Sequence, residues 1–387
     1  MTSPANIDDV FTPPSTDLGP GWGQSLSNGA LGPALLHLVT ARARLGPPDP
    51  AHAWLRAATR APVSSHIDGG LFCGATALAY VLHIASPTHP LLDALDEHID
   101  TLARKRLDAA HARINQGELA ETAEFDLIKG LTGIGTYLLT RTPGSRRTTD
   151  VLTYLVRLTQ PIRHRGEELP GWWAHNAPIS GGDFSGGHAN LGLAHGISGP
   201  LALLSAAQIR GITVEGQDTA IARICSWMDH WHTTDTDGAA GWPRWITQTQ
   251  HRNGTGAETN PMPLAWCYGT PGQARAQQLA AQALGEDERH VIAVRALAPC
   301  ASNTAAIARL DGSLCHGRAG LLQTLRRAAT DGGIHALTPH LTALEEQARG
   351  AACTGAGFLE GAAGNALALL PGTAQRIGWD ACLLTTV

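Results

Sequence analysis

A short glycine motif recurs seven times along this chain, and the repeat limits the possible folds more than any other feature. Gly-x-x-Gly, or a close variant, has leading glycines 44 to 73 residues apart in the 387-residue sequence. Such spacing is typical of one supersecondary unit repeated with connections of varying length. The copies are NGALG (28–32), CGATA (73–77), KGLTG (129–133), HGISG (195–199), YGTPG (268–272), HGRAG (316–320) and EGAAG (360–364).

The segments between the motifs predict helices of two kinds. An alanine- and leucine-rich stretch such as 200–209 follows each motif and predicts a buried inner helix. Amphipathic segments lie between these stretches, with the i, i+3, i+4, i+7 spacing of a surface helix in Ile221, Ile224, Cys225 and Met228. Seven such hairpins bury both ends of the stack only by closing into a ring. We therefore predict an all-α fold, an α/α toroid of about seven inner and seven outer helices with every glycine turn at one end.

One domain is expected. We assign residues 26–387 to the toroid and residues 1–25, which are acidic and proline-rich, to a loosely ordered tail. Two long polar inserts interrupt the repeat. Residues 91–121 predict an exposed long helix or a small appendage, and residues 235–261 predict a polar loop at the rim.

Composition narrows the possible partners and location. Hydrophobic residues make up 43% of the chain and charged residues 16%, with a net charge of −5 and no long basic run. This balance argues against nucleic acid and anionic membranes as main partners. No segment approaches the roughly 20 apolar residues of a membrane span, and the N-terminus lacks the regions of a signal peptide. Seven scattered cysteines do not suggest a disulfide framework, so we expect a cytoplasmic protein with reduced thiols.

Three of the turns carry reactive side chains in a common register. His195 stands just before the leading glycine of the fourth copy, Cys267 and Tyr268 before that of the fifth, and Cys315 and His316 before that of the sixth. Equivalent positions in a ring of repeats can converge on one point. Two cysteines and one histidine would then form a three-ligand site with an open fourth position, which is typical of catalytic zinc.

The proposed ligands also favour one kind of chemistry. A free thiol, with a pKa near 8.5, is only a few per cent thiolate at neutral pH, whereas zinc deprotonates a thiol that binds to it. Two sulfur ligands leave zinc little residual charge, so a bound substrate thiolate stays nucleophilic. The ligand set therefore points to thiol alkylation rather than to hydrolysis.

The ordered motifs resemble those of the lanthipeptide cyclases of the LanC type. The resemblance covers about residues 29–372, and its specificity lies in the order of the three reactive turns. The matching strings are EFDLIKGLTGIGTYLL (124–139), LPGWW (169–173), NLGLAHGISGPLALL (190–204), WCYGTPG (266–272) and LCHGRAGLL (314–322).

The resemblance implies a fold, a metal and a reaction. It implies an α/α toroid with one zinc ion held by Cys267, Cys315 and His316. The reaction adds a peptide cysteine thiol across dehydroalanine or dehydrobutyrine, which forms a thioether ring. The expected partners are a dehydrated precursor peptide with its leader, a dehydratase and an export transporter.

The resemblance also assigns proton transfer to His195 and places Asp126 and Tyr268 in the catalytic site. A histidine suits both halves of the reaction, since it can accept the thiol proton and later protonate the enolate. One departure is visible. The family often has an arginine four residues before the cysteine of the fifth turn, where this chain has Pro263.

Each assignment has a structural alternative. The two cysteines could be simply buried or belong to a closed structural zinc site, and His195 could be a satisfied core residue. Asp126 could merely cap the helix that follows it. Tyr268 and the candidate substrate-binding residues could instead be aromatic packing at the barrel mouth and in its loops. Those candidates are Trp266, Trp172 and Trp242.

Three other functions remain open at this point. The same zinc site could add glutathione or another small thiol to dehydroamino acids. A zinc-dependent prenyltransferase subunit is also an α/α toroid, but it is expected to use a carboxylate ligand. The third alternative is a non-catalytic toroidal scaffold with structural zinc.

Overall fold

The inner layer consists of helices that each begin within two residues of a leading glycine. The computed structural model describes residues 10–387 except 65, 67, 235–238, 256–262 and 332. The inner helices are α1 (Leu31–Arg42), α3 (Ala75–Ala85), α6 (Leu131–Arg141), α8 (Ser198–Ile209), α11 (Thr270–Leu284), α14 (Arg318–Asp331) and α16 (Ala362–Leu369).

An outer helix follows each inner one, and the first six outer helices pack on the inner helix that precedes them. In α7, for example, Ser145 caps the first turn by accepting a hydrogen bond from the Thr148 amide. Its buried positions include Val151, Leu152 and Leu155, which lie on one face. The outer helices are α2 (Asp49–Ala58), α4 (Leu92–Gln116), α7 (Arg146–Leu158), α9 (Gln217–His230), α12 (Asp287–Ser302), α15 (Thr338–Arg349) and α17 (Thr373–Ile377).

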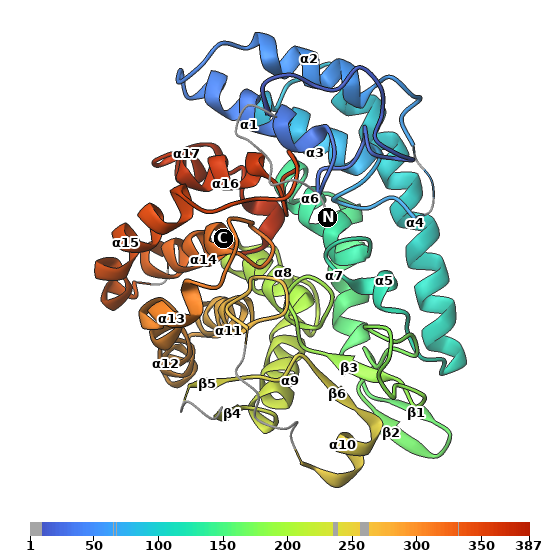
Figure 1. Ribbon diagram of the computed structural model, residues 1–387. Coiled ribbons are helices and arrows are strands. Elements are labelled where there is room, and N and C mark those ends of the chain that lie inside the picture. The colour runs from blue at the N-terminus through green and yellow to red at the C-terminus, as the bar shows by residue number, and fades with distance from the viewer. Residues whose placement is uncertain (1–9, 65, 67, 235–238, 256–262, 332) are drawn as a thin grey trace.

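The inner helices form a closed ring. Each contacts the next along the chain, and α16 packs against α1 to complete the circle. Figure 1 shows the outer helices following one another round the rim, from α2 at the top through α4 and α9 to α12 and α15. The predicted all-α toroid, with seven inner and seven outer helices in the described part of the chain, is confirmed. None of the described helices is long and apolar enough to span a membrane.

The second glycine of the motif allows the close approach that each turn requires. A Cβ atom on Gly320 would lie 1.9 Å from the carbonyl oxygen of Leu314, and one on Gly364 would lie 1.8 Å from that of Phe358. Both contacts join the glycine to the residue six positions earlier. The turn therefore folds back onto the start of the helix, and only glycine leaves room for it.

The last residues of the chain pack inside the ring. A 3-10 helix at Ala381–Leu383 contacts α6, and the Tyr80 hydroxyl on α3 donates to the Trp379 carbonyl at 2.9 Å. Arg275 on α11 is fully buried and donates to the Thr385 carbonyl at 2.8 Å. Since these partners belong to helices on different sides of the ring, the C-terminal segment fills part of its interior.

The predicted rim loop at 235–261 is more ordered than a plain polar loop. Its described residues contain β5 (Ala240–Gly241), β6 (Trp245–Thr247) and α10 (Gln248–Asn253), whereas 235–238 and 256–261 lie outside the described residues. β6 pairs with β3 (His188–Asn190), and β5 pairs with β4 (Thr233–Thr234). The β-branched and aromatic residues of Trp245–Thr247 favour this pairing.

The insert at 91–121 is largely the outer helix of the second hairpin rather than an appendage. One face of α4 is buried against α3, α6 and α7, at Leu95, Ile99, Leu102 and Leu107 among others. Gly117 ends the helix in the left-handed conformation, with φ of 68°. The remaining elements are β1 (Ile162–His164), β2 (Glu167–Leu169), α5 (Thr122–Phe125), α13 (Thr304–Ile307) and a 3-10 helix at His335–Leu337.

The described part of the predicted tail packs on the first hairpin. Val10 is 1% exposed, and its carbonyl accepts hydrogen bonds from His37 and Trp54, both at 2.7 Å. Residues 1–9 lie outside the described residues.

Candidate metal centre and proton-transfer pair

Backbone hydrogen bonds hold the glycine turns in a common register. We call the residue two positions before each leading glycine the ligand position. In the fourth to seventh turns it donates its amide to the carbonyl of the same position in the next turn. Ala194 donates in this way to Cys267 at 3.2 Å, Cys267 to Cys315 at 3.2 Å, and Cys315 to Leu359 at 2.8 Å. Leu359 donates in turn to Ser27 at 2.8 Å, across the closure of the ring. Side chains at equivalent positions are therefore neighbours, as the sequence register predicts.

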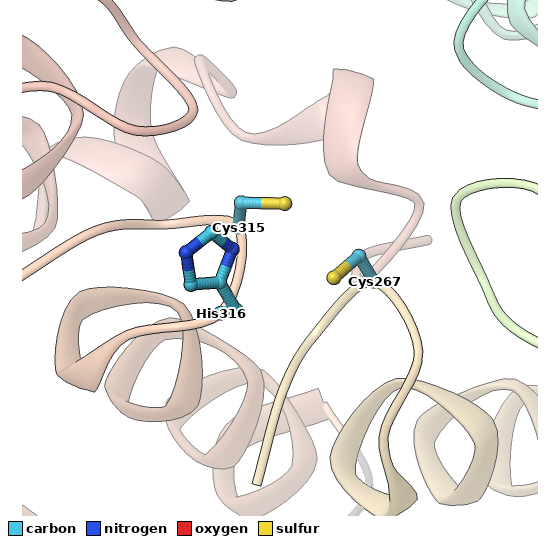
Figure 2. Close-up of side chains that lie close together, drawn as sticks. All are labelled: Cys267, Cys315 and His316. Carbon is cyan, nitrogen blue, oxygen red and sulfur yellow. The ribbon is translucent and has the colours of Figure 1, made fainter. Parts of the chain in front are cut away.

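Cys267, Cys315 and His316 form a compact cluster of potential metal ligands. Their donor atoms all lie within 4.8 Å of one another. In Figure 2 the Cys267 side chain reaches from the turn before α11 toward Cys315 and His316 at the turn before α14. Cys267 is buried, Cys315 is half-buried and His316 is exposed, so the cluster opens toward solvent on one side. This arrangement fits three protein ligands and one accessible coordination position.

Hydrogen bonds within the cluster favour a thiolate at Cys267. The Cys315 thiol and the His316 ring both donate to the Cys267 sulfur, and together they lower the pKa of Cys267 although burial opposes the shift. The same contact with Cys267, together with burial, raises the pKa of the Cys315 thiol. The bond to Cys267 also raises the pKa of His316. The cluster already stabilises negative charge on sulfur, which is the form in which cysteine binds a metal.

Asp311 lies beside the histidine of this cluster. Its Oδ2 lies 3.6 Å from His316 Nε2, and its Oδ1 accepts a hydrogen bond from the Ser313 amide at 2.9 Å. The other ring nitrogen, Nδ1, is then free to face the sulfur atoms, as Figure 2 shows. A carboxylate beside the non-ligating nitrogen is the usual outer partner of a histidine that binds zinc. The residues present therefore fit a zinc ion.

His195 forms a short pair with Asp126. His195 Nδ1 donates to Asp126 Oδ2 at 2.6 Å, and the carboxyl group is almost fully buried whereas 34% of the His195 side chain is exposed. Because a carboxylate only accepts hydrogen bonds, Nδ1 carries the proton and Nε2 is left as the basic nitrogen. Asp126 Oδ1 also accepts the amides of Lys129 and Gly130, both at 2.7 Å. Asp126 thus caps the start of α6 and orients His195 at the same time.

Tyr268 joins the histidine to the sulfur cluster. Its ring stacks on that of His195, with centroids 5.6 Å apart, and it directly follows Cys267 in the chain. Burial raises the pKa of Tyr268 to about 12, although the Asn190 amide, which donates to the phenol oxygen at 3.4 Å, partly opposes the shift. Tyr268 is therefore a neutral phenol at physiological pH. Since its oxygen already accepts from Asn190, its proton is available for donation.

The three tryptophans predicted to bind substrate are core residues in this structure. Trp266, Trp172 and Trp242 are each 1% exposed. Trp266 Nε1 donates to the Leu383 carbonyl at 2.9 Å, and the Trp172 ring packs edge-on against Trp227. None of the three offers a free ring face to a ligand in this structure. Their predicted role in substrate binding has no contact here to support it and stays a prediction.

Two residues that position the site were not singled out in the sequence. Asp311 lies five residues before His316, and an acidic residue shortly before a candidate histidine ligand was an available signal. Asn190 lies within the matched string 190–204, but its bond to Tyr268 depends on strand β3. No local pattern in the sequence indicates that contact.

The fold and the ordered turns define the class of protein. The sequence profile of the lanthionine synthetase C-like protein family matches residues 20–384, so the chain belongs to this family. Over 265 residues the chain is 22% identical to nisin biosynthesis protein NisC of Lactococcus lactis subsp. lactis. That match covers 66% of this chain and 61% of NisC. Among solved structures, nisin cyclase superposes with a TM-score of 0.75 over 95% of this chain and 93% of its own, at 20% identity. This likeness confirms the toroidal fold.

Proposed function

We propose that this protein is a zinc-dependent cyclase that forms lanthionine and methyllanthionine thioether rings in a dehydrated lanthipeptide precursor. The observation that carries the proposal is the position of the Cys267–Cys315–His316 cluster beside the His195–Asp126 pair, with Tyr268 between them. Family membership and the likeness to NisC support the same reaction.

Cys267, Cys315 and His316 would hold the zinc ion. When bound, zinc would keep the substrate cysteine deprotonated and, with two anionic sulfur ligands, leave that thiolate electron-rich. Asp311 would fix the orientation of the His316 ring.

His195, held by Asp126, would transfer the proton, and Tyr268 would stabilise the negative charge that develops during the reaction. The reaction joins the cysteine sulfur to the β-carbon of the dehydroamino acid, breaks the carbon–carbon π bond and leaves the thiol proton on the α-carbon. His195 Nε2 would accept that proton and return it, while Asp126 holds the ring and stabilises its protonated form. The Tyr268 hydroxyl would donate to the acyl oxygen, where negative charge collects as the sulfur adds.

The proposal includes the biological setting expected from the sequence. The substrate is a precursor peptide with its leader, modified first by a dehydratase and later passed to an export transporter. The cyclase would act before export, in the cytoplasm, where thiols are reduced.

Mass spectrometry of a dehydrated, cysteine-containing peptide tests the reaction. Ring closure leaves the peptide mass unchanged but consumes a thiol, so the product should no longer react with N-ethylmaleimide and should resist fragmentation within the ring. The zinc-loaded protein should close rings, whereas the metal-stripped protein should not.

A parallel incubation with glutathione separates the small-thiol alternative, because that product gains the mass of glutathione. Ring closure without zinc would contradict the metal assignment. Neither product from the zinc-loaded protein would favour the scaffold.

A further inference from the structure

An exposed arginine stands at the end of a short line of aromatic rings that leads to His195. The Arg244 Cζ atom lies 5.8 Å from the centre of the Trp245 ring. Trp245 packs edge-on against Tyr268 with centroids 6.4 Å apart, and Tyr268 stacks on His195. The line connects the proton-transfer pair to a positive charge on the rim.

The backbone around Arg244 is firmly attached to the catalytic turns. Its carbonyl accepts the Leu191 amide at 2.9 Å, in the segment that leads to His195. The carbonyl of Pro243 accepts from Gln273 on α11, the helix that follows Cys267, at 3.0 Å. On the other side, Trp245 pairs with Asn190 across the β3–β6 ribbon. The base of this side chain therefore has a fixed position relative to the site.

The side chain itself has no anionic partner among the residues that the structure describes. Arg244 is exposed and forms no salt bridge there, only the contact with Trp245. Arg252, on the neighbouring α10, shows the contrast, since it is paired with Glu167 at 2.8 Å. A guanidinium on a fixed backbone, resting on an aromatic ring and lacking a carboxylate, is suited to bind one from a ligand.

We propose that Arg244 and Trp245 form a specificity subsite that binds a carboxylate of the peptide substrate near the ring being closed. This inference rests on the proposed cyclase function. The carboxylate belongs to an Asp or Glu side chain or to the peptide C-terminus. Two steps lead from Arg244 to Tyr268: 5.8 Å from the guanidinium to the Trp245 ring, and 6.4 Å from that ring to the Tyr268 ring. Each step corresponds to about two residues of extended chain. The recognised carboxylate should therefore lie within about four residues of the reacting pair.

A charge-swap experiment tests the subsite directly. Synthetic peptides with one dehydroalanine and one cysteine would carry Glu, Gln or Lys at each position within four residues of the dehydroalanine, with an acid or an amide at the C-terminus. The wild-type protein should prefer Glu over Gln by about three- to fivefold in kcat/KM at one position, the effect of one partly exposed ion pair. Arg244→Glu should reverse the order and prefer Lys.

The control makes the same charge change elsewhere. Arg146→Glu alters an almost fully exposed arginine at the start of the outer helix α7, and it should leave the ranking of peptides unchanged. Zinc content should be equal in all three proteins. A preference that follows the C-terminal acid instead of a Glu side chain would assign the subsite to the peptide terminus.

Two failures can be told apart. If the wild-type protein and Arg244→Glu close rings with the same ranking of Glu, Gln and Lys, and the terminal acid has no effect, the subsite is wrong and the cyclase function stands. If the zinc-loaded wild-type protein closes no ring in any peptide, the proposed function fails and the subsite fails with it.

Discussion

The first, second and seventh glycine turns have the same backbone role as the third to sixth, yet only the latter four bring reactive side chains together. We call these groups the plain turns and the site turns. The amide of Cys315 in a site turn and that of Leu359 in a plain turn each donate to the next turn at 2.8 Å. At the ligand position the plain turns carry Ser27, Phe72 and Leu359. The shared backbone thus serves the fold, whereas the chemistry depends on side chains at a few equivalent positions.

The largest contrast should come from thiols in the two kinds of turn. Replacing Cys267, Cys315 or His316 by alanine should weaken zinc binding by more than about 10²-fold and abolish cyclisation, since it removes a ligand rather than an outer partner. Cys73 is the matched control, because it is an exposed thiol beside the leading glycine of a plain turn. Cys73→Ala should keep both zinc and activity, as measured by metal analysis and thiol trapping. Full zinc retention by Cys315→Ala would refute the site.

Proton transfer should show the next largest effect. His195→Asn and Asp126→Asn should keep zinc and fold while lowering turnover by roughly 10²- to 10⁴-fold, the usual contribution of a general acid or base. Asn28→Ala changes the residue equivalent to His195 in the first turn and should leave turnover unchanged. Zinc lost together with activity in His195→Asn would make His195 a ligand. Normal turnover would make it a packing residue.

The comparison also predicts where the two kinds of turn should behave alike. Gly320→Ala in a site turn and Gly364→Ala in a plain turn should each destabilise the protein by about 3 kcal/mol, because both Cβ atoms would collide with a carbonyl oxygen. Gly350→Ala adds a Cβ with nothing within 4 Å and should be nearly neutral. Denaturant unfolding measures all three. A large cost in only one of the two turns would show that the motif does not have one structural role.

The smallest effect concerns pH and two buried histidines. Burial lowers the pKa of His188, on the ribbon beside the site, to about 4. Burial also lowers the pKa of His37 in the first hairpin, and the bond from His37 to Val10 partly offsets that effect. The unfolded chain binds a proton near pH 6.5 and the folded one does not, so stability is lost as pH falls from about 6.5 to 4. His188 should account for up to about 2–3 kcal/mol of this loss.

Unfolding of His188→Leu at several pH values measures that share. The stability of His188→Leu should fall less on acidification than that of the wild type. The difference from the wild type should be larger for His188→Leu than for His37→Leu. Equal pH dependence in His188→Leu and the wild type would contradict the assignment.

Much of the fold was predictable because glycine, alanine and leucine follow a local rule in every repeat. The helices, the ring and the convergence of Cys267, Cys315 and His316 follow from that register. The β3–β6 ribbon was not predicted, because its pairing joins segments more than 50 residues apart and depends on the ring already being in place.

The burial of Trp266 was missed for a related reason. It packs under the C-terminal segment, and its partner Leu383 is 117 residues away in sequence. Nothing near Trp266 in the sequence distinguishes a ring at the barrel mouth from one beneath a returning chain end. Contacts of this kind depend on the global path of the chain, which local periodicity does not determine.

Closure of the ring has a consequence for how the protein is made. The seam between α1 and α16 joins residues more than 300 positions apart. The Tyr80 hydroxyl on α3 likewise finds its hydrogen-bond acceptor, the Trp379 carbonyl, near the end of the chain. During synthesis the early hairpins form an open stack whose apolar end stays uncovered until α16 has left the ribosome. Such long-range closure is slow and leaves hydrophobic surface exposed meanwhile. We therefore expect the unfinished ring to need protection from aggregation until α16 packs against α1.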